Sequence, residues 1–222
     1  MSVRSVLFDA ADTLFHTRGT VGELYWSVAS EYGCTAGPED IQEAFRKHFP
    51  FSGPLSRSDE KNWWKDVVRR VFEDAGMFLN FDEYFDRVYE HFASDNTWVL
   101  FPETKETLEA LASQQIPTGV VSNFDSRLYR VLEHLGILSF FKTITISSEV
   151  GFAKPDRRIF LQAARALGVE PWEALLVGDS PHDDVRGAEQ AGLQGVLIDR
   201  HHRYEPDGMR RIADLTEILR LV

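Results

Sequence analysis

The sequence predicts an α/β fold, in which helices cover both faces of a parallel sheet and a helical segment is inserted after the first strand. Three observations support this prediction. A short apolar run, Val6-Leu7-Phe8, begins the chain, residues 17–98 show helical spacing, and strand and helix patterns alternate after Pro102. Such alternation is typical of parallel sheets, because each connection between parallel strands crosses the sheet, usually through a helix.

The N-terminal half contains one predicted strand, residues 3–8, and four predicted helices. Helical spacing starts after Thr20 and stops at Gly33, and Pro38 opens the second helix. Ser58 is the expected N-cap of the third helix. That helix has the widest apolar stripe, formed by Trp64, Val67, Val68, Val71, Phe72 and Ala75. The fourth helix is marked by Phe81, Phe85, Val88 and Phe92.

Most of the aromatic residues of the chain lie in residues 17–98. Two explanations remain open at this point. Large side chains can fill the core of a small helical bundle, or they can line a substrate pocket. The sequence therefore predicts two units: residues 1–16 and 99–222 form the sheet-containing core, and residues 17–98 form an inserted helical domain.

The C-terminal half alternates between short apolar runs and helical patterns. The predicted strands are residues 117–121, 143–147, 174–177 and 195–198. Gly136 and Gly168 stand where helices are expected to end. Residues 200–210 are polar and are expected to form a loop. In such sheets, ligands bind beyond the carboxyl ends of the strands.

Composition and charge exclude several classes of function. The 222 residues carry a net charge of −11, which argues against nucleic acids and anionic membranes as partners. The single cysteine, Cys34, allows no intrachain disulfide, and no apolar run reaches the roughly 18 residues of a membrane span. We therefore expect a cytoplasmic protein; its oligomeric state cannot be predicted from the sequence.

Polar residues that suit phosphoryl transfer follow the predicted strands. They are Asp9, Ser122, Asn123, Lys154, Asp179 and Asp184. A carboxylate can attack a phosphoryl group only when the repulsion between the two anions is relieved, which a lysine and a divalent cation can do. Carboxylates and a backbone carbonyl are suitable ligands for Mg²⁺. His16, His48, His182 and Asp12 are given no role in this prediction.

Four motifs in order resemble those of the haloacid dehalogenase (HAD) superfamily, subfamily I. They are VLFDAADTLF, VVSNFD, GFAKPDRRIF and LLVGDSPHDDVRGAEQAG. The resemblance implies a Rossmann-like core with a helical cap, Mg²⁺ as cofactor and a small phosphorylated metabolite as substrate. It implies Asp9 as nucleophile, Ser122, Asn123 and Lys154 as phosphate-binding groups, with Ser122 and Lys154 also catalytic, and a metal held by Asp9, the Ala11 carbonyl, Asp179 and Asp184.

Ala11 departs from the pattern, because most phosphatases of the superfamily have an aspartate there as general acid and base. Loss of such a group typically lowers the rate by about 10² to 10⁴. The first hypothesis is a specialised phosphatase that acts on easily expelled leaving groups or borrows an acid. The second is cleavage of a C–P or C–halogen bond, with Lys47 as the least implausible imine-forming lysine among Lys47, Lys61 and Lys65. The third is a catalytically impaired scaffold that binds a phosphorylated ligand or a protein.

Overall fold

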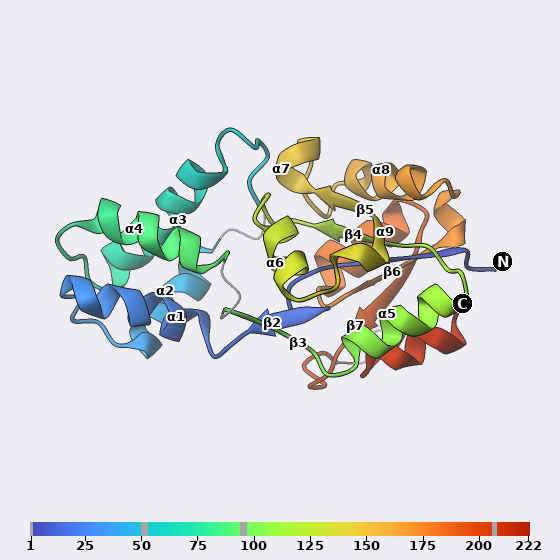
Figure 1. The fold of residues 1–222 in the computed structure, drawn as a ribbon, viewed down its shortest axis with the longest axis horizontal. Helices are drawn as coiled ribbons and strands as arrows, with labels where there is room; N and C mark the ends of the chain where they lie inside the picture. Colours follow the sequence, from blue (N-terminus) through green and yellow to red (C-terminus); the bar gives the residue numbers. More distant parts are fainter. Residues whose placement is uncertain (1, 50–52, 94–96, 206–207) are drawn as a thin grey trace.

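The computed structural model describes residues 2–49, 53–93, 97–205 and 208–222. Its central sheet has six parallel strands in the order β5-β4-β1-β6-β7-β8 (Figure 1). The strands are β1 (Ser5–Phe8), β4 (Thr118–Ser122), β5 (Phe141–Ile146), β6 (Ala174–Gly178), β7 (Gln194–Ile198) and β8 (Arg211–Ile212). The predicted parallel α/β core is confirmed.

Helices cover both faces of this sheet, and strand β1 shows why. Val6 and Phe8 pack into one buried cluster together with residues of α5 (Thr104–Ser113) and α6 (Leu128–His134). Leu7 points to the opposite face and packs against α8 (Arg157–Leu167) and α9 (Gly187–Gln190). Because successive strand residues face opposite sides, a strand that is covered twice must be apolar throughout.

In the described part of the inserted segment, four α-helices lie at one end of the molecule, opposite the two chain termini (Figure 1). They are α1 (Val21–Ala29), α2 (Pro38–His48), α3 (Glu60–Ala75) and α4 (Phe81–His91). Their apolar faces form a separate buried cluster in which Tyr84, Phe72 and Phe85 are almost completely enclosed. We refer to α1–α4 as the helical group.

Two short strands that the sequence did not predict join the helical group to the sheet. Strands β2 (Phe15–Thr17) and β3 (Trp98–Leu100) pair antiparallel, so that the chain leaves and re-enters the sheet region at one place. A second correction concerns Ser58. Helix α3 begins at Glu60 after Asp59, and the hydroxyl of Ser58 contacts that of Ser56 at 2.9 Å. Along the described residues, no helix combines the length and the apolarity needed to cross a bilayer.

Candidate active site

The carboxyl edge of the sheet brings the predicted site residues together. Asp9 directly follows β1, Ser122 ends β4 and Asp179 directly follows β6, and these strands are neighbours in the order β4-β1-β6. The backbone N–H of Asp9 donates to the Val177 carbonyl at 2.9 Å, which continues the ladder past the end of the strand. Parallel pairing therefore explains why residues distant in sequence share one edge of the sheet.

Lys154 lies at the centre of this edge and is only 5% exposed. Its Nζ donates to Asp9 Oδ1 at 2.5 Å and to Asp184 Oδ1 at 2.6 Å. Burial lowers the pKa of Lys154, but the charges of Asp184 and Asp9 outweigh it, so the pKa lies above its ordinary value. The lysine is thus a permanent cation that touches two carboxylates.

Asp184 is fixed by the turn on which it stands. It belongs to a π-helical turn, Pro181–Arg186, which is capped by the Ser180 hydroxyl accepting from the N–H of Asp183. The Ser180 N–H donates to Asp184 Oδ2 at 3.0 Å. The carboxylate has therefore little freedom to turn away from the site.

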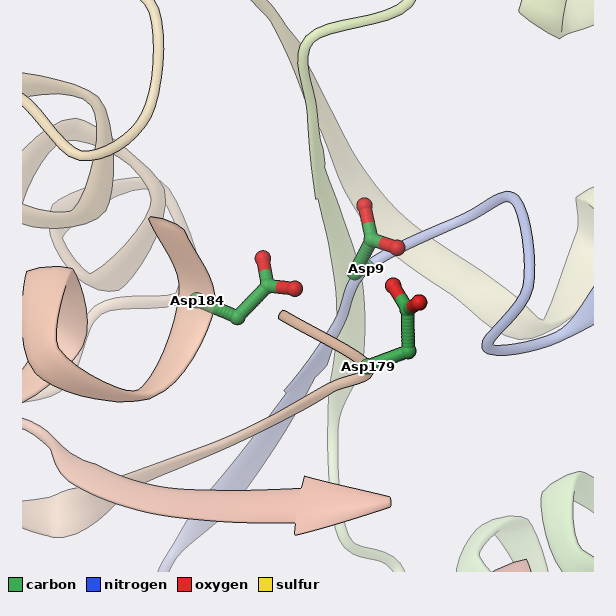
Figure 2. A group of neighbouring side chains, drawn as sticks. All are labelled: Asp9, Asp179 and Asp184. Atoms are coloured by element: carbon green, nitrogen blue, oxygen red, sulfur yellow. The ribbon is translucent and has the colours of Figure 1, made fainter. Parts of the chain in front are cut away.

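The three carboxylates of Asp9, Asp179 and Asp184 point toward one another (Figure 2), and each offers an oxygen within 4.8 Å of the others. Burial and the neighbouring charges of Asp9 and Asp184 raise the pKa of Asp179 to about 8. Burial raises the pKa of Asp184 to about 6, against the opposing effect of Lys154. Lys154 and Arg203, whose guanidinium lies 3.5 Å from Asp179, bring two positive charges against three carboxylates, and an all-oxygen donor set fits a hard divalent cation.

The loop after Asp9 supports the carboxylate of Asp9 from the other side. The Thr13 hydroxyl donates to Asp9 Oδ2 at 3.1 Å, so both carboxylate oxygens are held. Arg200 donates to the carbonyls of Asp12 and Thr13 and pairs with Glu103 at 2.7 Å, which secures the loop. This anchoring arginine was not found from the sequence.

Ala11 and Asp12 both line the cavity, as Asp9 does. Ala11 presents a methyl group where a titratable side chain would be needed for proton transfer. Asp12 adopts a left-handed backbone with φ of 60°, and desolvation together with the charge of Asp9 raises the pKa of its carboxyl.

Ser122 and Asn123 both line the cavity but make different contacts. Ser122 is buried, lines the cavity, and its Oγ accepts from the Phe124 N–H at 3.3 Å. Both ends of the Asn123 side-chain amide contact the backbone of Lys154: Oδ1 accepts from its N–H at 2.7 Å, and Nδ2 donates to its carbonyl at 3.0 Å. The amide therefore holds the lysine loop in place.

A cavity of about 460 Å³ lies between this edge and the helical group. On the side of the helical group its lining includes Tyr25, Phe45, Phe49, Trp64 and Tyr89. Several of these rings also belong to the buried cluster of α1–α4. The two explanations for the aromatic residues are thus compatible, because the same rings fill the core and face the cavity.

The lysines considered for imine formation lie elsewhere. Lys47, Lys61 and Lys65 pair with Asp74, Asp86 and Asp82, respectively. None of the three is among the described residues that line the cavity. The structure therefore does not support the imine-based route to C–P cleavage.

Two further contacts were missed because they come from a segment predicted only as a loop. Arg203 lies 3.5 Å from Asp179, and Tyr204 lines the cavity. Both are held by Asp199, which directly follows β7 and accepts from their backbone N–H groups at 2.8 and 3.3 Å. An aspartate after a buried strand, like Asp9 and Asp179, was the available signal.

The helical group is also linked to the core by polar side chains. Trp64 donates to Asp125 Oδ2 at 2.5 Å, and Asp125 forms a two-point ion pair with Arg127. Glu60 accepts from the N–H and hydroxyl of Ser126 and from the hydroxyl of Ser148. These contacts close the helical group over the carboxyl edge.

Comparisons with known proteins agree with this architecture. A family model described as haloacid dehalogenase-like hydrolase matches residues 3–192. The chain is 33% identical to the zebrafish (Danio rerio) haloacid dehalogenase-like hydrolase domain-containing protein 3, over 96% of this chain and 90% of the relative. It is 38% identical to a phosphoserine phosphatase of Thermus thermophilus, over 68% of this chain and 62% of that protein.

A solved structure with the same fold is that of a 2-haloacid dehalogenase from Pseudomonas syringae. It has a TM-score of 0.70 at 24% identity and covers 99% of this chain and 97% of that one. At this level of identity the likeness shows the fold alone. The match to the family model and the identity to the zebrafish relative show that the chain belongs to the haloacid dehalogenase-like hydrolase family.

Proposed function

We propose that the protein is a Mg²⁺-dependent phosphatase that acts on a small phosphorylated metabolite through an aspartyl-phosphate at Asp9. The observation that carries this proposal is the cluster of Asp9, Lys154, Asp179 and Asp184. A buried lysine beside the nucleophile suits a phosphoryl group, and a trio of carboxylates suits a metal. Attack on a neutral haloalkane carbon requires no such carboxylate trio.

The residues at this edge would divide the work. Asp9, Asp179, Asp184 and the Ala11 carbonyl would hold Mg²⁺, which supplies positive charge against the phosphoryl oxygens. Lys154 positions the nucleophile and offsets its charge, and Ser122 offers a hydroxyl to a phosphoryl oxygen. Asn123 contributes through its grip on the Lys154 loop.

The reaction has two steps on Asp9. An Asp9 oxygen attacks phosphorus, the bond to the ester oxygen breaks, and that oxygen leaves with the electron pair. Water then attacks phosphorus, which releases inorganic phosphate and restores the carboxylate. Ala11 gives proton transfer in neither step, so the first step depends on how readily the leaving group accepts negative charge.

The two units of the chain have different roles under this proposal. Residues 17–98 act as a cap over the core formed by residues 1–16 and 99–222, and closure excludes water from the carboxyl edge. The net charge of −11 and the single cysteine support a small-molecule partner and a cytoplasmic location, rather than nucleic acid or a membrane surface.

The test is phosphate release from a panel of phosphate monoesters with and without Mg²⁺, with Asp9→Asn as the blank. We expect release only from the wild type and only with Mg²⁺. Fluoroberyllate, which resembles a phosphoryl group on a carboxylate, should raise the Tm when Mg²⁺ is present. Chloride release from a 2-haloacid without metal would contradict the proposal in favour of dehalogenation. If the protein released no phosphate and fluoroberyllate did not shift the Tm, the scaffold hypothesis would be favoured.

A further inference from the structure

The cavity has two chemically different ends. Its floor is the carboxyl edge, with Asp9, Lys154, Asp179 and Asp184. Among the described residues of 17–98, those that line it are apolar or aromatic, apart from Gly53 and the neutral Thr17. A volume of about 460 Å³ accommodates a phosphoryl group together with one or two fused rings. The part of a substrate that faces the helical group therefore meets ring surfaces.

Only one cation lies at the aromatic end among the described lining residues, and it is already balanced. Arg127 forms its two-point ion pair with the fully buried Asp125 and also donates to the Tyr89 carbonyl at 2.9 Å. Its guanidinium lies 3.8 Å from the centre of the Tyr89 ring. A carboxylate group on a substrate would enter this end without a free cationic partner, which is unfavourable.

Ala11 independently restricts the leaving group. The ester oxygen must depart as an anion because the alanine cannot protonate it. A phenol ionises near pKa 10, as the tyrosine side chain does, whereas water and aliphatic alcohols ionise only near 16. The missing acid is therefore tolerable for an aryl ester and severe for an alkyl ester.

We infer that this site is selective for phosphate monoesters of uncharged aromatic alcohols, whose ring packs against the aromatic wall and leaves as a phenolate. This inference rests on the proposed function and names its substrate class. The phosphorus–aryl oxygen bond breaks as the bond to Asp9 forms, and the phenolate takes its proton from water. Amino-acid phosphates such as phosphoserine are excluded by the balanced charge of Arg127.

The substrate test compares kcat/KM, which reports phosphoryl transfer to Asp9, for esters matched in size. Phenyl phosphate should exceed cyclohexyl phosphate by at least about 100-fold, because the two rings are similar in size while the alkoxide of cyclohexanol is a much poorer leaving group than phenolate. Phenyl phosphate should also exceed O-phospho-L-serine by about 100-fold, and O-phospho-L-tyrosine by about 10-fold, because of their charged groups.

A variant pair tests the aromatic wall. Phe45 lines the cavity, whereas Phe78 packs in the same cluster but is not among the lining residues. Phe45→Ala should raise KM for phenyl phosphate about 10-fold while inhibition by inorganic phosphate, which reaches only the floor, is unchanged. Both substitutions should lower the Tm by a similar amount, but Phe78→Ala should leave KM for phenyl phosphate unchanged.

The outcomes separate the two proposals. Equal kcat/KM for phenyl and cyclohexyl phosphate, or faster hydrolysis of phosphoserine, overturns the substrate class while the phosphatase proposal stands. A protein that binds fluoroberyllate with Mg²⁺ but does not hydrolyse phenyl phosphate also overturns the substrate class alone. A protein with neither fluoroberyllate binding nor phosphate release overturns both.

Discussion

The two walls of the cavity are built in opposite ways. The floor consists of ionisable side chains that follow buried strands and are held by hydrogen bonds, as Lys154 is by Asp9 and Asp184. The opposite wall consists of rings such as Phe45 and Phe49, whose centres lie 4.9 Å apart. Under the proposed function this difference separates chemistry from selection: the floor would transfer the phosphoryl group, and the wall would select the group that carries it.

The walls also differ in how strongly they imply function. Burying several charged groups opposes folding unless each is paired. A cluster of buried carboxylates therefore indicates a site that binds a ligand. Aromatic packing stabilises a helical cluster whether or not it faces a substrate. The floor therefore supports a function by itself, whereas the wall does so only together with Ala11 and the balanced Arg127.

The largest expected effect comes from removing the cation of the floor. Lys154→Met should reduce phosphatase kcat/KM by about 10³-fold or more, because it removes positive charge beside the phosphoryl group. It should also lower the free energy of unfolding by about 3–5 kcal/mol, since buried carboxylates lose their partner. Steady-state kinetics and urea unfolding measure the two effects.

A lysine of the helical group is the matched control for that substitution. Lys61 forms a surface ion pair with Asp86 at 2.7 Å, and Lys61→Met should change neither activity nor stability appreciably. If the two methionine variants behaved alike, the contrast between the two walls would be wrong.

A smaller effect is expected from restoring the missing acid. Ala11→Asp should raise kcat/KM for cyclohexyl phosphate by about 100-fold and for phenyl phosphate by less than about 10-fold, because only the alkoxide needs protonation. The selectivity of the enzyme for aryl esters should shrink accordingly. Ala11→Asn has nearly the same shape without an acid, and an equal gain in that variant would argue against a proton-transfer explanation.

The smallest predicted effect is thermal. Asp179 and Asp184 have raised pKa values of about 8 and 6 in the folded protein. Between an unfolded value near 4 and these values, the folded state binds more protons, so stability falls as pH rises. Without metal, Tm should drop by a few degrees from about pH 5 to 8, and Mg²⁺ should raise Tm more at the higher pH.

Scanning fluorimetry with EDTA or Mg²⁺ checks this dependence. Asp179→Asn removes the group with the higher pKa and should flatten the slope without metal. If the Tm of the wild type in EDTA rose from about pH 5 to 8, the predicted fall in stability with rising pH would be wrong.

The fold and the floor of the site were accessible from the sequence because each rests on a local pattern. An apolar run followed by a polar residue marks β1 with Asp9, and also β6 with Asp179. Parallel topology then requires these residues to share an edge. The helices of the helical group could also be predicted, because their apolar stripes recur at helical spacing and Gly33, with φ of 81°, ends the 3₁₀ turn Ser30–Tyr32 that follows α1.

The remaining features depend on contacts between distant segments. Strands β2 and β3 are only three residues long. They pair with each other, although the whole helical group separates them in the sequence. The role of Asn123 as a clamp on Lys154 was not visible, because an amide after a strand can equally face a ligand. Arg127 gives no signal either: Asp125 is a near neighbour in sequence, but the Tyr89 carbonyl and ring that Arg127 contacts belong to the helical group.

The contact between Glu60 and the core has a consequence for the release of product from the cavity. This buried carboxylate, on the first residue of α3, accepts from Ser126 at 3.0 and 2.5 Å and from Ser148 at 2.5 Å. If the helical group moves away from the core, water can replace each of these donors. The contact at Glu60 can then break without exposing a large apolar surface. The structure thus combines an aromatic cavity wall with a polar contact between the helical group and the core, and release of that contact, rather than the chemistry, would limit how fast the ring leaves.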